Sequence, residues 1–448
     1  MNVEEQLQRV LRQQAAVSPS PDALRRILAA TVSAMAEAPS KRDDRSGIAR
    51  PRRGRQLVAA ATALAVAVGI FAVLTRSFSG KPGPHSSPAP VNACHWKVVP
   101  TPNSSPSVLD NRLTAVSASG PNDAWAVGSA VHNVEGGQSY PLLMHWDGTR
   151  WTLVPSALAA RNAYLMGVAS ITPDDAWAVG FAGPLSPHPL VEHWNGTSWS
   201  DVPIPAPSGT STLSAVFAIS TDDVWAVGSE GRAKGLTLIE HWNGSRWAMV
   251  TSPNASPAGF RSAPDNNLAA VGASAPGDVV AAGTTRDGGH VYHADPLIER
   301  WNGSSWTLAP APVFSPVTRL FLESVSVVSA ADVWVVGAAS SATGAGESPF
   351  IGHWDGSRWT PVGLAVPGQG VLFGVTTASG NIWAVGNETG PLRPLIEHGV
   401  NDTWTALVPL TPPRSALTGV AASPDGTIWA VGSASGAKES TLALRCAP

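Results

Sequence analysis

The sequence is poor in charge and in cysteine, and these shortages exclude several classes of protein. Only 14% of its 448 residues are Asp, Glu, Lys or Arg, against roughly a quarter in an ordinary soluble domain. A hydrophobic fraction of 44% still rules out an intrinsically disordered chain, because such chains lack the apolar residues that form a core. Two cysteines are too few for a cysteine-rich zinc site or a disulfide-dense scaffold.

The charges are unevenly distributed along the chain. Residues 1–56 carry 11 Lys/Arg against 6 Asp/Glu, whereas residues 77–448 carry 17 against 26. Nucleic-acid phosphates bind to a basic protein surface. The net negative charge of residues 77–448 therefore predicts no nucleic-acid partner. The sequence also contains no HExxH, GxSxG, Walker or glycine-rich dinucleotide motif, so it predicts no catalytic residue, no metal site and no cofactor.

A hydrophobic run near the N-terminus predicts a membrane span. Residues 57–75 (LVAAATALAVAVGIFAVLT) contain no charge, and a helix of this length covers close to the roughly 30 Å bilayer core. The basic segment RPRRGR (50–55) precedes it, and only Arg76 and Lys81 follow closely. The positive-inside rule then places the N-terminus in the cytoplasm and the bulk of the chain outside the cell membrane.

A cleaved signal peptide is the alternative interpretation of this run. The 55 residues before it are far longer than a normal n-region, and no A-x-A cleavage site follows. We therefore expect a cytoplasmic segment at 1–55, one transmembrane helix at 56–76, a Pro-rich stalk at 77–91 and an extracytoplasmic domain at 92–448.

The cytoplasmic segment predicts two short amphipathic helices. Apolar residues recur at helical spacing at Val3, Leu7 and Leu11, and again at Leu24 and Ile27. So short a segment buries little core alone, so its apolar stripes would meet a cytosolic protein partner, each other or a second copy. The layout resembles membrane-anchored bacterial anti-sigma factors, which implies a regulatory role for residues 1–55. It departs from the zinc-type members of that family, because no cysteine occurs before Cys94.

Residues 92–448 are dominated by an internal repeat. Seven copies follow one another: LTAVSASGPNDAWAVG (113–128), LMGVASITPDDAWAVG (165–180), LSAVFAISTDDVWAVG (213–228), LAAVGASAPGDVVAAG (268–283), LESVSVVSAADVWVVG (322–337), LFGVTTASGNIWAVG (372–386) and LTGVAASPDGTIWAVG (417–432). Each of the first six continues into a second half such as PLLMHWDGTRWTLVP or, degraded, PLIEHGVNDTWTALVP.

Each unit predicts four short strands, which in the first copy cover 113–118, 124–128, 142–146 and 151–155. Asp-Gly or Asn-Gly between the third and fourth strands predicts a hairpin, since these pairs tolerate positive φ. Four-stranded units repeated seven times predict an all-β fold, a seven-bladed β-propeller.

The two ends of the repeat region complete each other. The last copy stops at TLALRC, whereas HWKVVP (95–100) matches the fourth strand RWTLVP (150–155). We therefore expect the N-terminal strand to close the ring by pairing with the C-terminal one. Cys94 and Cys446 then fall on opposite arms of the interrupted hairpin, where a disulfide would replace the missing turn. Such a bond needs an oxidising compartment, which agrees with the topology predicted from charge.

All eighteen tryptophans occupy repeat positions. Because nearly every copy has tryptophan at the same positions, we expect these side chains to pack within and between blades rather than to bind sugar. The Asp two residues before the second-strand tryptophan, as in Asp123, is interpreted as a turn residue that bonds its own backbone.

The last two copies carry a family resemblance. SGNIWAVG (379–386) and PDGTIWAVG (424–432) resemble the repeats of two-component-regulator propellers, and HWNGTSW (193–199) is similar to kelch repeats without their Gly-Gly doublet. The resemblance implies an extracytoplasmic sensing domain of bacteria.

Comparison of the copies predicts where a ligand binds. Loops between second and third strands and connectors between units differ freely, and they open on one face of a propeller, where loops commonly carry specificity. The fourth copy departs most, and its segment 284–295 supplies the candidate ligand-binding residues Asp287, His290, Tyr292, His293 and Asp295. Two imidazoles beside carboxylates suit a divalent metal, although a solvated polar loop is the simpler interpretation.

These observations predict a membrane-anchored extracytoplasmic propeller that binds or senses a ligand, a protein or a glycan, through its variable loops. Two alternatives stay open: an extracytoplasmic carbohydrate-active enzyme, and an anti-sigma-like regulator acting through residues 1–55.

Overall fold

The computed structural model describes residues 95–447 apart from short gaps at 106–107, 133–137, 159–161, 184, 206, 208, 232–234, 258–262, 288–289, 314–317, 342–345, 365–367, 391, 402 and 437. The chain divides into two units, residues 1–89 and 90–448. The expected cytoplasmic helices, the expected span at 57–75, the stalk and Cys94 lie outside the described residues. Within the described ranges, no helix has the length and apolar character needed to cross a membrane.

The described residues form an all-β structure. Its largest sheet contains β26 (Ser415–Ala422), β27 (Ile428–Ser435), β28 (Glu439–Cys446), β1 (Lys97–Val99), β2 (Val108–Gly120), β3 (Asp123–His132), β4 (Ser139–Trp146) and β5 (Trp151–Leu153). Two further sheets contain β6 (Ala163–Thr172), β7 (Asp175–Ala182), β8 (His188–Trp194) and β9 (Trp199–Asp201), and β10 (Ser211–Ser220), β11 (Asp223–Glu230), β12 (Leu236–Trp242) and β13 (Trp247–Met249).

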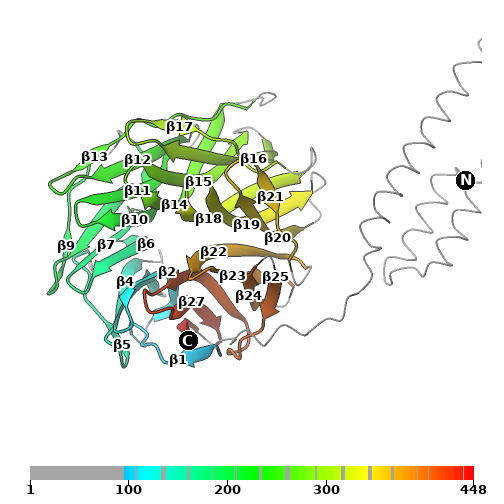
Figure 1. Ribbon diagram of the computed structural model, residues 1–448. Helices are drawn as coiled ribbons and strands as arrows, with labels where there is room; N and C mark the ends of the chain where they lie inside the picture. The colour runs from blue at the N-terminus through cyan, green and yellow to red at the C-terminus, as the bar shows by residue number, and fades with distance from the viewer. Residues whose placement is uncertain are drawn as a thin grey trace, which may run out of the picture. The chain divides into compact units, whose positions relative to one another are not determined.

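The remaining strands form three four-stranded sheets. They are β14 (Pro264–Ala275), β15 (Asp278–Asp287), β16 (His290–Trp301) and β17 (Trp306–Leu308); β18 (Thr318–Ser329), β19 (Asp332–Ser341), β20 (Glu347–Trp354) and β21 (Trp359–Pro361); and β22 (Gly370–Ala378), β23 (Asn381–Glu388), β24 (Arg393–Val400) and β25 (Thr403–Leu407). Figure 1 shows the sheets side by side around a common centre, in a β-propeller arrangement.

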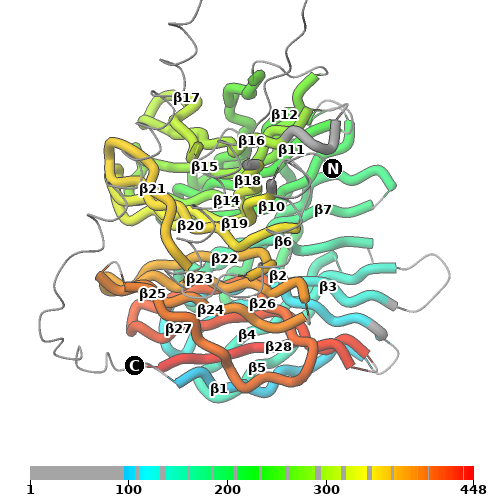
Figure 2. Tube along the Cα trace, turned by 90° about the vertical axis from the view of Figure 1, so that its right-hand side faces the viewer, coloured from blue at the N-terminus to red at the C-terminus, as the bar shows by residue number. Residues whose placement is uncertain are grey.

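The largest sheet joins the two ends of the repeat region. β1 pairs antiparallel with β28, with Lys97 opposite Arg445 and Val99 opposite Ala443, and Figure 2 shows the two strands together. β28 also meets β2 through a single parallel bridge between Asp110 and Glu439. An ion pair of 2.7 Å between Arg112 Nη2 and Glu439 Oε2 reinforces this contact.

The strands differ in length from those expected. The first expected strand, 113–118, is part of the longer β2, whereas the fourth, 151–155, ends at Leu153 in β5. The inner strands lengthen because their ladder continues beyond the repeat consensus, as far as the pair Val108 and His132.

The hairpins between third and fourth strands follow the Asp-Gly and Asn-Gly signals. Trp146 pairs with Trp151, and Gly148 between them has φ of 92°. Asp147 Oδ1 accepts the backbone N–H of Thr149 at 2.8 Å and of Arg150 at 2.9 Å. These bonds and the Thr149 hydroxyl hold the pKa of Asp147 down at about 2, so its charge persists in mild acid.

The tryptophans pack between sheets, as the repeat pattern predicts. Trp177 on β7 is 1% exposed and meets two indoles of the next sheet, Trp242 at 4.9 Å and Trp247 at 5.3 Å between ring centroids. Edge-to-face indoles pack densely at this spacing. The same three-ring arrangement recurs for Trp125 with Trp194 and Trp199.

Candidate functional site

The antiparallel strands place two kinds of connection on opposite rims. Turns from first to second strands and from third to fourth strands share one edge of each sheet, which we call the turn rim. Loops from second to third strands, together with the connectors between sheets, share the other edge, which we call the variable rim. The variable rim is the face that the sequence predicts to bind a ligand.

The predicted site in the fourth repeat is not a loop. β15 runs to Asp287 and β16 begins at His290, and these two residues are paired. The loop interpretation is therefore wrong: the ladder extends past Thr285, which faces Asp295, as far as the pair Asp287 and His290, with one irregularity after Arg286. The extension follows from the threonines and valines that flank this hairpin, which favour strand.

The five predicted residues are distributed along this hairpin. The Asp287 side chain is buried, 4% exposed, whereas Asp295 is exposed. His290, Tyr292 and His293 lie on β16, where the structure describes the course of the strand but not these side chains. Among the described residues, no group of three or more His, Cys, Asp or Glu side chains is placed to hold a metal ion.

A groove of about 730 Å³ lies on the variable rim between β23–β24 and the connector after β25. Its lining includes Arg393, Val408, Pro409, Pro412 and Arg414, and the two arginines are its charged members. Val408 is 84% exposed and the adjacent Leu410 is 93% exposed. The groove therefore offers apolar surface next to two guanidinium groups.

Local bonds hold this connector in place. The hydroxyl of Ser415 donates to the carbonyl of Pro412 at 2.6 Å, and the N–H of Ser435 donates to the carbonyl of Arg414 at 3.1 Å. The prolines also restrict the backbone. The repeat pattern did not point to this segment, although VPLTPPR (408–414) combines two aliphatic residues with three prolines and an arginine, a composition typical of an exposed connector.

A second recurrent feature is a bond between an aspartate and a histidine. Asp123 Oδ1 lies 2.7 Å from His145 Nε2, and Asp223 Oδ1 lies 2.8 Å from His241 Nε2. The expectation that this Asp bonds its own backbone is therefore wrong. The reason is that the residue begins the second strand, opposite the third, so its carboxylate reaches the neighbouring histidine.

These histidines also stack on tryptophan, which explains their recurrence. Ring centroids are 4.1 Å apart for Trp225 and His241 and 4.5 Å for Trp125 and His145. In the β14–β17 sheet, Arg300 replaces the histidine and its Nε bonds Asp278 at 2.8 Å. Repetition in sheet after sheet indicates a packing unit rather than a single acid–base couple.

Four buried glutamates recur on the third strands, at the Glu-His or Glu-Arg pairs, whose repetition in the sequence indicates a structural role. They precede the third-strand histidine or arginine and are 0% exposed: Glu192, Glu240, Glu299 and Glu397. Burial raises the pKa of Glu240 to about 8, and it raises the pKa of Glu299 to about 8 against the lowering effect of the Thr237 and Ser252 hydroxyls. Each of them stands at the same inward position of its strand.

Comparison with known proteins identifies the fold class. No family model matches the sequence, and no curated protein matches it. Two similar solved structures are "YCF48 bound to D1 peptide" (TM-score 0.51, 14% identity, 80% of this chain and 97% of that one) and a PL25 ulvan lyase (0.51, 11%, 79% and 94%). The same lyase bound to -[GlcA(1-4)Rha3S]- matches with a TM-score of 0.50 and 12% identity, over 79% of this chain and 94% of that one. The chain is thus a β-propeller protein.

Proposed function

We propose that this protein is a membrane-anchored binding or sensing module that presents its variable rim to an extracytoplasmic protein or glycan. The observation that carries the proposal is the groove at Arg393 and Arg414. Exposed apolar side chains next to fixed charges, on loops supported by a rigid scaffold, are typical of recognition surfaces.

The chemistry of the groove defines the ligand it suits. Its charged lining residues are both arginines, and guanidinium groups bind carboxylate, sulfate or phosphate oxygens through paired hydrogen bonds. Val408 and the prolines of the lining add apolar contact. The surface therefore favours an anionic ligand with an apolar part, such as an acidic protein segment or an acidic glycan. On the β15–β16 hairpin of the same rim, His290, Tyr292, His293 and the exposed Asp295 are proposed to extend the binding surface, whereas Asp287 is buried.

The rest of the proposed architecture follows from the sequence. Residues 57–75 anchor the chain in the cell membrane, residues 1–55 face the cytoplasm and contact a cytosolic partner, and the propeller is outside. The repeats are of the two-component-regulator or kelch-like kind and form seven blades, with β1 completing the last one. The pairing of Lys97 with Arg445 supports this closure.

A disulfide between Cys94 and Cys446 is part of the same proposal. Cys446 is 0% exposed and is not a free thiol. The other cysteine of the chain is Cys94, which precedes β1 by three positions, next to the strand that pairs with β28.

The groove can be tested with the full chain in detergent micelles. We expect the protein to be retained on an array of acidic peptides and acidic oligosaccharides, and the double variant R393E/R414E to lose at least about tenfold in affinity. The matched control is R358E, because Arg358 is an exposed arginine of the turn rim. Equal retention of all three proteins would contradict the proposal. Product release from a retained oligosaccharide would instead favour the carbohydrate-active enzyme, and capture of a sigma factor by residues 1–55 the anti-sigma-like regulator.

A further inference from the structure

Two junctions between sheets lack a tryptophan that the repeat supplies elsewhere, and a cavity lies at each. Val280 stands at the second-strand tryptophan position of β15, and a cavity of about 110 Å³ lies between it and Trp354 and Trp359. Gly399 stands at the end of β24, where the other complete repeats have tryptophan. A larger cavity of about 270 Å³ lies at that junction, between the β18–β21 and β22–β25 sheets.

The missing indole at Gly399 leaves space next to the turn that lines the larger cavity, because the equivalent indole of Trp242 donates to the matching turn, at the Thr221 carbonyl, at 3.1 Å. Gly399 pairs with Trp404, and a Cβ added to Gly399 would lie 2.7 Å from the Trp404 ring. The Trp404 ring therefore lies directly against Gly399 and occupies space that a side chain at that position would need. Its ring lies 5.8 Å from Trp334, farther than the 4.9 to 5.3 Å separations at the Trp177 junction. Trp334 is left 7% exposed, against 1% for Trp177.

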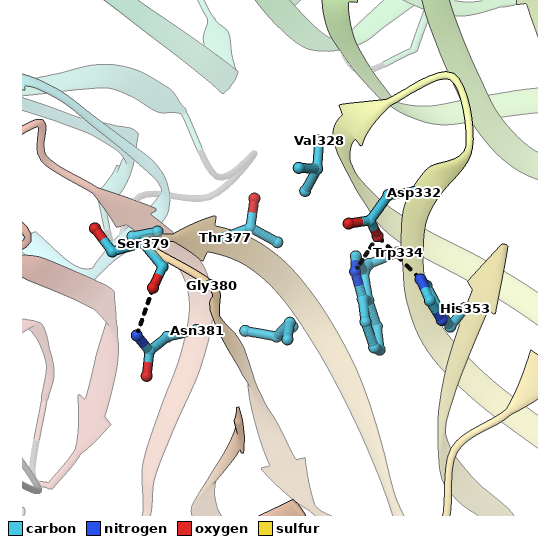
Figure 3. A pocket seen from close by; sticks show the side chains of 10 residues that line it. Val328, Asp332, Trp334, His353, Thr377, Ser379, Gly380 and Asn381 are labelled. Atoms are coloured by element: carbon cyan, nitrogen blue, oxygen red, sulfur yellow. Dashed lines mark hydrogen bonds and ion pairs between the residues drawn. The ribbon is translucent and has the colours of Figure 1, made fainter. Parts of the chain in front are cut away.

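One wall of the cavity carries an accessible carboxylate. Asp332 Oδ1 accepts the indole N–H of Trp334 at 2.8 Å and lies 2.9 Å from His353 Nε2. Figure 3 shows the other oxygen turned toward the open side, facing Thr377. The Asp332 side chain is 41% exposed, whereas its equivalent Asp123 is 5% exposed and accepts the hydroxyls of Ser119 and Ser170.

The opposite wall supplies neutral acceptors. Thr377, Ser379 and Asn381 line it, and Figure 3 shows them across the cavity from Asp332. Asn381 Nδ2 donates to the Ser379 carbonyl at 3.2 Å, and its Oδ1 lies 2.9 Å from His398 Nε2. On this wall the Thr377 hydroxyl faces Asp332 (Figure 3). It lies 3.0 Å from the Ser326 hydroxyl, and because a hydroxyl oxygen has two lone pairs it can still accept a hydrogen bond from a ligand.

The cavity suits a cation of the size of one side chain. Neither lysine nor arginine lines it, and Asp332 is its one acidic residue. Its volume is below the roughly 300 to 1,000 Å³ of drug-sized ligand pockets. One face of Trp334 is covered by His353, with an interplanar angle of 14° and centroids 4.0 Å apart, which leaves little aromatic surface for a sugar ring.

We propose that this cavity binds the guanidinium group of an arginine side chain from a partner protein. A guanidinium has five N–H donors in a plane, and here the Asp332 carboxylate lies on one side and the Thr377 hydroxyl on the other. A lysine ammonium would satisfy Asp332 without using both walls. The cavity is on the turn rim, so the inference is independent of the groove on the variable rim.

The test uses ligand-observed NMR titration of the full chain with N-acetyl-arginine amide. We expect saturable binding, with N-acetyl-citrulline amide, which is uncharged but similar in shape, at least about tenfold weaker. D332N should lose at least about tenfold in affinity. The matched control D223N removes the same Asp–His bond in another sheet and should bind as the unmodified protein does. Free arginine is titrated in parallel, because its amine and carboxylate are unblocked, unlike those of an arginine within a protein. Binding of free arginine without binding of N-acetyl-arginine amide would overturn the assignment to a partner protein.

A second variant keeps the inference testable if D332N unfolds. G399W restores the tryptophan of the repeat, which should fill the cavity, raise the melting temperature and abolish binding of the arginine probe. Equal binding of arginine and citrulline probes, equal binding by D332N and D223N, or full binding by a folded G399W would each overturn the proposal. None of these variants touches Arg393 or Arg414, so failure here leaves the result on the groove unchanged.

Discussion

The indole of Trp96 stands edge-on to that of Trp383, with ring centroids 5.6 Å apart and an interplanar angle of 82°. Trp151 and Trp429 make the same kind of contact at 5.1 Å and 79°. Trp96 directly precedes β1, so the segment ahead of the first full repeat packs against the β22–β25 sheet as an ordinary fourth strand would. The contact makes the start of the repeat region part of the core at its other end.

The variant W96A tests how firmly this segment is integrated. Truncation of a buried tryptophan such as Trp151, which is 4% exposed, removes contact area and leaves a cavity, which costs roughly 3 to 5 kcal/mol. Trp96 is only partly buried, so we expect W96A to lower the free energy of unfolding by less than W151A does, measured by chemical denaturation of the full chain. A near-neutral W96A beside a costly W151A would show that β1 contributes little to the stability of the propeller.

The glycine of the WAVG motif is required by a close approach of two strands. In β11, a Cβ on Gly228 would meet the carbonyl oxygen of Thr212 well inside van der Waals contact. The ladder shifts register between Leu213 and Ala215 at this point, which brings that carbonyl against the glycine. The space, rather than the backbone conformation, excludes a side chain.

We therefore expect G228A to destabilise the protein by roughly 2 to 3 kcal/mol, because overpacking forces the strands apart. The control is G363A, since nothing lies within 4 Å of a Cβ at that exposed position, and it should change stability by less than about 0.5 kcal/mol. Thermal unfolding of both variants measures the difference. Equal melting temperatures would contradict the steric explanation.

The sequence predicts the strands and their packing because each repeat carries the same signals, and comparison of copies removes ambiguity. It does not predict the bond from Asp123 to His145, because that contact depends on the register between two strands. The two cavities are predictable only in part. Val280 and Gly399 are visible as departures from the repeat, but whether neighbours collapse into the vacated space depends on three-dimensional packing.

The proposed disulfide predicts a redox-dependent stability. In the chain-entropy model, a bond between Cys94 and Cys446 stabilises the fold by at most about 5 to 6 kcal/mol, because it closes a very long loop. We expect a reducing agent and the variant C94S to lower the melting temperature by similar amounts, and the reducing agent to have no further effect on C94S. Recovery of both cysteines in alkylated form from the non-reduced protein would refute the bond.

Glu240 and Glu192 differ in what lies opposite them. Glu192 Oε1 accepts the Ser156 hydroxyl at 2.8 Å and the N–H of Leu158 at 3.1 Å. At the matching position before the next sheet, the connector has Ile204 in place of Ser156. Within the described structure, neither carboxyl oxygen of Glu240 has a hydrogen-bond partner. Burial therefore raises the pKa of Glu240 to about 8, and the group is protonated in the folded protein at neutral pH.

This raised pKa fixes the direction of a pH effect. The unfolded chain releases the Glu240 proton near the ordinary glutamate pKa of 4.5, whereas the folded protein holds it up to about 8. The contribution to stability is therefore complete below about 4.5 and is lost as the pH rises toward 8. We expect E240L to remove the part of this dependence that comes from Glu240, while the part from Glu299, whose pKa is also about 8, stays. E240L should stabilise the protein at pH 8 by on the order of 3 kcal/mol.

The control E192L should destabilise the protein, since the Leu158 N–H and the Ser156 hydroxyl would lose their acceptor. Denaturation curves between pH 5 and pH 9 measure both effects, and an unchanged slope in E240L would show that Glu240 ionises normally in the folded chain.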